Sequence, residues 1–167
     1  MNAIPIKTIL FDPHKNYKTP YMTRVRSRMS AWVYGHQKPP KQFIPEFGCT
    51  VFELRIHIEI QFSDGMRWTN AGQWQIDHIE PCAWFNEDNQ EHVFQCNHWS
   101  NIRPIWSEFN SIGPIDKHSH RPEVDYQSLK NVNPISFWEA KVGQAGQGQV
   151  DKLKTIIRVG QAGHGQD

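Results

Sequence analysis

The residues best suited to chemistry are an aspartate and a histidine that stand side by side in the segment WQIDHIEP. Asp77 and His78 close an apolar-rich run that Pro81 ends. If this run is a β-strand, the two adjacent side chains point to opposite faces and can serve two different roles. The Asp77 carboxylate can bind a hard cation through oxygen, and the His78 imidazole can take a proton from water near neutral pH.

Two strands and a helix are expected to position this pair. Residues 74–79 and 102–106 are predicted as short strands, and residues 80–100 as a long polar connection between them. Ser107 can begin a helix that follows the second strand. Asn110 then falls in its first turn, where its amide oxygen could point back toward Asp77.

Residues 51–62 carry two conflicting signals. Apolar and polar residues alternate strictly, which is typical of a strand. However, Thr50 and Glu53 form a capping box, and Gly65 stands where a glycine with left-handed backbone would end a helix. The flanking residues therefore favour a helix.

Basic residues gather near the N-terminus. Residues 1–41 carry eight Lys or Arg and one acid, whereas the remainder carries ten basic and sixteen acidic residues. This asymmetry indicates a surface that meets a polyanion, most commonly nucleic acid, although a solvated basic surface without a partner is an alternative. A helix is predicted over residues 23–34, with Thr23 as N-cap and Gly35 as its end. The candidates for contacts with a nucleic-acid backbone are Arg24, Arg26 and Arg28 on this helix, and Arg103 on the second strand.

An ordered set of motifs resembles the H-N-H endonuclease family. The resemblance covers roughly residues 24–117 and is specific because many short motifs occur in the family's order. It implies a ββα-metal (His-Me finger) core that holds one divalent ion and hydrolyses DNA phosphodiester bonds, as a nick or a double-strand cut. The matching residues are Gly48-Cys49-Thr50, Gln61-Phe62, Gly65-Met66, Trp68, Asn70, Trp74, Ile76-Asp77-His78-Ile79, Pro81, Ser100-Asn101-Ile102, Pro104-Ile105-Trp106 and Asn110.

The resemblance also implies a role for each central residue. His78 looks like the general base that activates water, and Asp77 and Asn110 look like the metal ligands. Asn101 looks like the residue that hydrogen-bonds the loop carrying His78. Oxygen donors suit Mg²⁺ or Mn²⁺, with other first-row divalent ions open. The lysine that many relatives carry about three residues after Asn110 is replaced by Gly113, so one phosphate contact is missing or moved.

Two other functions stay open. A non-catalytic nucleic-acid-binding protein could retain the same fold. A structural zinc domain could use Cys82, His92, Cys96 and His98, but their C-x9-H-x3-C-x-H spacing lacks the tight ligand pairs of such sites. Small buried cysteines are the simpler interpretation.

The chain as a whole is expected to be a small single α+β domain. Its 167 residues suffice for one core. Residues 1–47 are predicted as a basic arm and helix, 48–120 as the nuclease core, and 121–167 as a C-terminal extension. The Gly/Gln octamer at 142–149 recurs at 159–166 and predicts a flexible tail.

The sequence also bears on the setting in which the protein works. No run of eighteen apolar residues occurs, so no membrane segment is expected. The first residues do not resemble a secretory signal, and three cysteines are an odd number, so a cytoplasmic protein is expected. A small free-standing nuclease of this kind is typical of phages and mobile elements.

Overall fold

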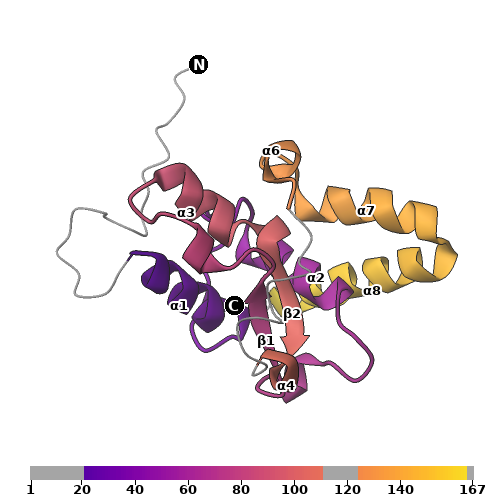
Figure 1. The fold of residues 1–167 in the computed structure, drawn as a ribbon. Coiled ribbons are helices and arrows are strands. Elements are labelled where there is room, and N and C mark those ends of the chain that lie inside the picture. The colour runs from indigo at the N-terminus through magenta and orange to yellow at the C-terminus, as the bar shows by residue number, and fades with distance from the viewer. Residues whose placement is uncertain (1–20, 111–123, 165–167) are drawn as a thin grey trace.

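A two-stranded antiparallel sheet with helices packed around it makes up the domain (Figure 1). The computed structural model describes residues 21–110 and 124–164. The described elements form a small single α+β domain, as expected. In chain order they are α1 (Tyr21–Val33), α2 (Val51–Ile60), η1 (Trp68–Asn70), β1 (Trp74–His78), η2 (Cys82–Trp84), α3 (Gln90–Asn97), η3 (Trp99–Asn101), β2 (Ile102–Trp106), α4 (Ser107–Asn110), α6 (Tyr126–Leu129), α7 (Pro134–Ala145) and α8 (Gln147–His164).

The segment with conflicting signals is the helix α2. The Thr50 side chain accepts a hydrogen bond from the Glu53 amide, and the Glu53 carboxylate accepts one from the Thr50 amide at 2.7 Å. This capping box confirms the helix prediction, because it satisfies amides that a helix start leaves without partners. Gly65 has a positive φ of 89°, but it lies in a turn five residues beyond the helix end and does not cap α2.

Both predicted strands form and pair with each other. Trp74 lies opposite Trp106, and His78 lies opposite Ile102. Pro104 can occupy the middle of β2 because a two-stranded sheet has only edge strands. Trp74 is fully buried and packs its ring against Phe62, with 4.8 Å between centroids. The sheet is thereby anchored in the main hydrophobic core, which α1 and α2 also line.

Two expectations about the helices before β2 were wrong. The helix α1 starts at Tyr21 within the described residues, so Thr23 lies inside it and is not its N-cap. The connection between the strands contains the helix α3, capped by the Asn89 side chain, which accepts from the amides of Glu91 and His92. Asn89 is a strong local start signal. The helix was missed because its sequence is mostly polar: its buried residues are Val93, Cys96 and the polar Asn97.

The C-terminal extension is helical over its described part, contrary to the expected flexible tail. The helices α7 and α8 form an antiparallel pair that packs on α2 (Figure 1). Gly146, with a positive φ of 107°, makes the turn between them. The physical reason is burial: Val142, Leu153 and Ile156 enclose a second core with Ile56 and Ile60 of α2. Burial of apolar residues within and between the Gly/Gln repeats therefore stabilises these two helices.

A histidine joins three of these elements. His57 of α2 is buried; its Nε2 contacts the Ile102 carbonyl of β2 at 2.8 Å, and the Trp138 indole of α7 donates to its Nδ1 at 2.9 Å. An imidazole that accepts at Nδ1 and donates at Nε2 is neutral. Burial, above all, lowers the pKa of His57 to about 4, which agrees with this neutral form. Among the described helices, none is long and apolar enough to cross a membrane.

Candidate functional site

The aspartate of the predicted site forms an ion pair with its cross-strand neighbour. Asp77 and Arg103 are register partners on β1 and β2. The Asp77 Oδ2 atom accepts from Arg103 Nε at 3.1 Å and lies 3.1 Å from Arg103 Nη2. The two side chains are 12% and 31% exposed, respectively. Arg103, predicted as a DNA contact, is thus held against the predicted metal ligand.

His78 lies beside two cysteines. The ligand atoms of His78, Cys82 and Cys96 all fall within 4.8 Å of one another. The Cys96 thiol donates to the Cys82 sulfur at 3.0 Å. This hydrogen bond is the main reason that the pKa of Cys82 lies well below the ordinary value for a thiol, and a hydrogen bond with His78 adds to the effect. The same sulfur contact and burial raise the pKa of Cys96.

The zinc set considered from spacing was wrong in two of its four members. Cys82 and Cys96 do meet, but His92 accepts at Nδ1 from the Asn86 amide at 3.1 Å, and His98 pairs with Ser100 at 2.8 Å. Neither belongs to the cluster around His78. Thirteen residues separate the two cysteines, and no local signal indicates that η2 and α3 bring them together.

Asn101 fixes the segment that follows His78. Its side chain is fully buried at the end of η3. The Oδ1 atom accepts from the Glu80 amide at 2.7 Å, while Nδ2 donates to the carbonyls of Glu80 at 3.1 Å and Cys96 at 2.8 Å. The Ile79 amide also donates to the Asn101 carbonyl at 2.8 Å. One amide side chain therefore joins the end of β1 to the end of α3.

The helix α4 follows β2 directly and lies against both strands. Ser107 ties its start to the segment before β1, because its hydroxyl donates to the Gly72 carbonyl at 3.0 Å. This position matches the helix expected after the second strand. The side chain of the predicted ligand Asn110, together with Gly113, lies outside the described part of the chain.

The arginines of α1 lie on a helix that packs beside α3. Met22 of α1 is buried against Val93 and Cys96 of α3. Arg24 lies 5.4 Å over the Tyr21 ring and Arg28 lies 5.9 Å over the Trp32 ring.

Arg26 of the same helix is exposed; its charge helps to lower the pKa of Cys82 and opposes the rise in the pKa of Cys96. Of the basic residues on α1, Arg26 therefore stands near the cysteines beside His78.

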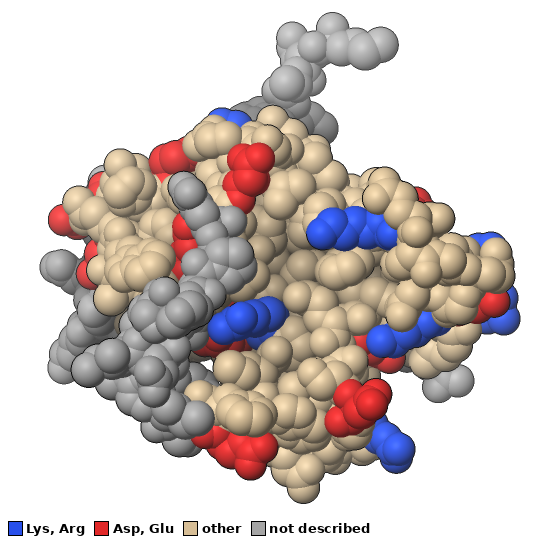
Figure 2. All heavy atoms as spheres, turned by 45° about the vertical axis from the view of Figure 1, so that its right-hand side comes forward, with Lys and Arg blue, Asp and Glu red and all other residues tan. Residues whose placement is uncertain are grey.

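Basic and acidic side chains both occur on the face shown in Figure 2. The described Lys and Arg side chains stand apart from one another there and form no continuous basic patch. The segment 74–110 contains six acids and one base. Glu80 is among them and is 8% exposed. A phosphate backbone would meet local repulsion there unless a cation is present.

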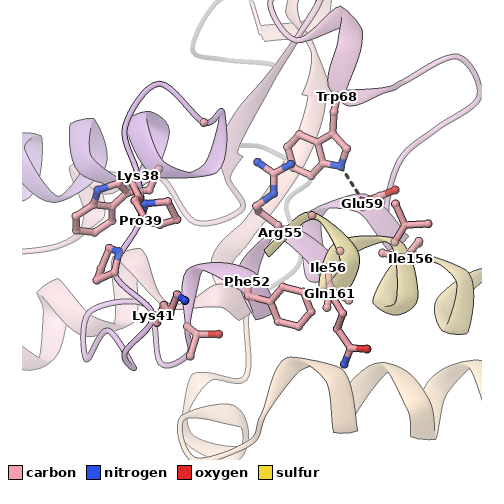
Figure 3. Close-up of a pocket in the computed structure, with 17 residues that line it drawn as sticks. Lys38, Pro39, Lys41, Phe52, Arg55, Ile56, Glu59, Trp68, Ile156 and Gln161 are labelled. Atoms are coloured by element: carbon pink, nitrogen blue, oxygen red, sulfur yellow. Dashed lines mark hydrogen bonds between the residues drawn. The ribbon is translucent and has the colours of Figure 1, made fainter. Parts of the chain in front are cut away.

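A separate cavity of about 810 Å³ opens between the α1–α2 connection, α2 and α8 (Figure 3). Arg55 stacks 4.1 Å over the Trp68 ring, whose indole donates to Glu59 at 2.7 Å. Asp77 and His78 do not line this cavity. Its lining is largely apolar, and it lies on a different part of the molecule from the Asp-His pair.

Comparisons with known proteins find relatives in a giant virus. Two uncharacterized proteins of Acanthamoeba polyphaga mimivirus are similar to the chain. One is 37% identical over 73 residues, which cover 43% of this chain and 32% of the relative. The other is 33% identical over 126 residues, or 74% of this chain and 50% of the relative. The chain thus spans half or less of their length, and no family model or solved structure matches it.

Proposed function

We propose that this protein is a metal-dependent DNA endonuclease of the H-N-H type, built on a ββα-metal core. The observation that carries the proposal is the arrangement around Asn101, whose buried amide fixes the backbone two residues beyond His78. The strand pair followed directly by α4 has the order that the resemblance implies. Asp77 and His78 are adjacent at the end of β1, so a carboxylate suited to a metal ion and an imidazole suited to accept a proton lie at one place.

The Asp77 carboxylate fits a hard divalent cation. Its donors are oxygens, and it is partly exposed. The Arg103 guanidinium already beside it indicates that this position favours positive charge. Asn110, on the adjoining helix, is the proposed second ligand by sequence position. Mg²⁺ or Mn²⁺ held there would polarise a phosphoryl oxygen and stabilise the leaving oxygen.

His78 is proposed as the general base. Its imidazole takes a proton from the attacking water, and Asn101 keeps the ring in place by fixing the following backbone. Arg103 has five N–H donors, and its partly exposed guanidinium can share them between Asp77 and a phosphate. Arg24, Arg26 and Arg28 would contact the DNA backbone without reading sequence.

Cleavage of supercoiled plasmid tests the proposal. Purified protein with Mg²⁺ or Mn²⁺ is expected to produce nicked or linear DNA, and EDTA is expected to stop it. His78→Ala should slow cleavage on the order of 10²–10⁴-fold, the usual loss for a general base. His36→Ala is the matched control, since His36 is exposed on the connection after α1. Equal rates for the two variants would refute the role of His78.

The Asp77–Arg103 ion pair favours a second candidate, a non-catalytic nucleic-acid-binding protein. Such a protein would keep the pair as a structural bridge between the strands. It would bind plasmid tightly and leave it uncut with every metal. Binding that weakens at high salt, without any cleavage, would support this alternative.

A further inference from the structure

The cluster of His78, Cys82 and Cys96 offers donors that the proposed Mg²⁺ chemistry does not use. The three residues come from the end of β1, from η2 and from α3, and their ligand atoms lie within 4.8 Å of one another. Cys82 and His78 are partly buried and Cys96 is buried. A single ion could therefore contact all three from one position.

Asn101 preorganises this cluster. It accepts from the amide of Glu80, which lies two residues from both His78 and Cys82, and it donates to the carbonyl of Cys96. The backbone segments that carry all three donors are thus joined through one buried side chain. Metal sites depend on this kind of support, because partners behind the ligands fix their orientation.

The chemistry of the donors selects the ion. One imidazole and two thiolates suit Zn²⁺ and other thiophilic ions, whereas Mg²⁺ prefers oxygen. Three protein ligands leave a fourth position open for water. The sulfurs are 3.0 Å apart and would have to separate to about 3.8 Å, the spacing of two Zn–S bonds of about 2.3 Å in a tetrahedron.

We propose that His78, Cys82 and Cys96 form a zinc site, and that Zn²⁺ bound there engages the His78 imidazole and inhibits cleavage. The inhibitory part rests on the proposed function, because it requires His78 to act as the base. An imidazole nitrogen that coordinates Zn²⁺ has no lone pair left for a proton from water. The binding part stands on the geometry of the three donors alone.

Co²⁺ binding tests the site without any reference to DNA. The reduced full-length protein is titrated with Co²⁺, and thiolate coordination is read from the near-ultraviolet charge-transfer absorption and its displacement by Zn²⁺. The wild type is expected to bind one ion. Cys82→Ser/Cys96→Ser should lose the absorption entirely, and Cys82→Ser alone should weaken it. Cys49→Ala is the control, since Cys49 is buried elsewhere in the main core.

Circular dichroism establishes that each variant is folded. A folded, reduced wild-type protein without the charge-transfer absorption would overturn the site. If Cys82 and Cys96 form a disulfide even in a reducing buffer, and the protein takes up no metal, the site is overturned as well. Absorption that persists in the double serine variant would assign the ion to other ligands and refute the proposal.

Zn²⁺ inhibition tests the consequence. Mg²⁺-supported cleavage by the wild type should fall at least tenfold with equimolar Zn²⁺, whereas cleavage by Cys82→Ser/Cys96→Ser should change less than twofold with Zn²⁺, relative to the same variant's own rate without Zn²⁺. Equal inhibition of both proteins would overturn the inhibitory role. If no preparation cuts DNA, the nuclease proposal and the inhibitory role fail, while the Co²⁺ titration still decides the metal site.

Discussion

Replacement of Asn101 by alanine gives the sharpest test of how the site is held together. The side chain is fully buried and makes three hydrogen bonds, two of them with Glu80 and one with Cys96. Each such bond contributes about 1 kcal/mol net, and a buried amide left without its acceptor adds a cost of about 1–3 kcal/mol. We expect Asn101→Ala to lower the free energy of unfolding by about 4–6 kcal/mol. For a domain of this size that corresponds to a melting temperature lower by roughly 8–24 °C.

A second buried asparagine supplies the control. Asn97 of α3 is equally buried, but its Nδ2 donates to the Val93 carbonyl within the same helix and to the Met22 sulfur of α1, and its Oδ1 has no hydrogen-bond partner among the described residues. Asn97→Ala therefore removes one local bond and one weak bond to sulfur, and is expected to cost about 1–2 kcal/mol. It should leave the end of β1 in place.

Thermal melts measure the loss of stability. Plasmid cleavage, measured well below the melting temperature of each variant, measures the loss of positioning at the site. Asn101→Ala is expected to lose cleavage beyond what its unfolded fraction explains, because the backbone after His78 is released. Asn97→Ala should cut at the wild-type rate. A melting temperature within 2 °C of wild type for Asn101→Ala would refute the hydrogen-bond reasoning. Equal cleavage by the two folded variants would refute the positioning role.

Two further predictions concern stability. Burial, as the largest cause, lowers the pKa of His57 and of His98 to about 4, below the value of about 6.5 expected in the unfolded chain. The unfolded state therefore binds more protons between these values, so urea denaturation should show stability falling as pH drops from about 6.5 toward 4, by up to about 3 kcal/mol per histidine; a flat profile would contradict the buried neutral rings. Gly48→Ala should destabilise by more than Gly35→Ala in thermal melts: both glycines have positive φ, but only at Gly48 would the new Cβ lie 2.3 Å from the His98 ring. Equal losses would show that the ring moves aside.

Much of the local structure was predicted from residues that lie only a few positions apart in the sequence. Thr50 and Glu53 predict the start of α2 because a capping box joins residues three apart. The strands around Asp77 and His78 were predicted by local pattern and by Pro81. Asn89, by contrast, carried a start signal for α3 that a polar segment obscured.

The sequence by itself determined which side chains stand next to one another along the chain, and so it placed Asp77 and His78 together at a strand end. Only the tertiary structure decided that Arg103 faces Asp77 and that Cys82 and Cys96 meet beside His78. The extension from 134 to 164 folds as helices for the same reason, since its apolar residues find their partners on α2. Contacts between residues far apart in the sequence depend on how whole helices and strands pack, and a pattern within one turn or one strand does not predict that packing.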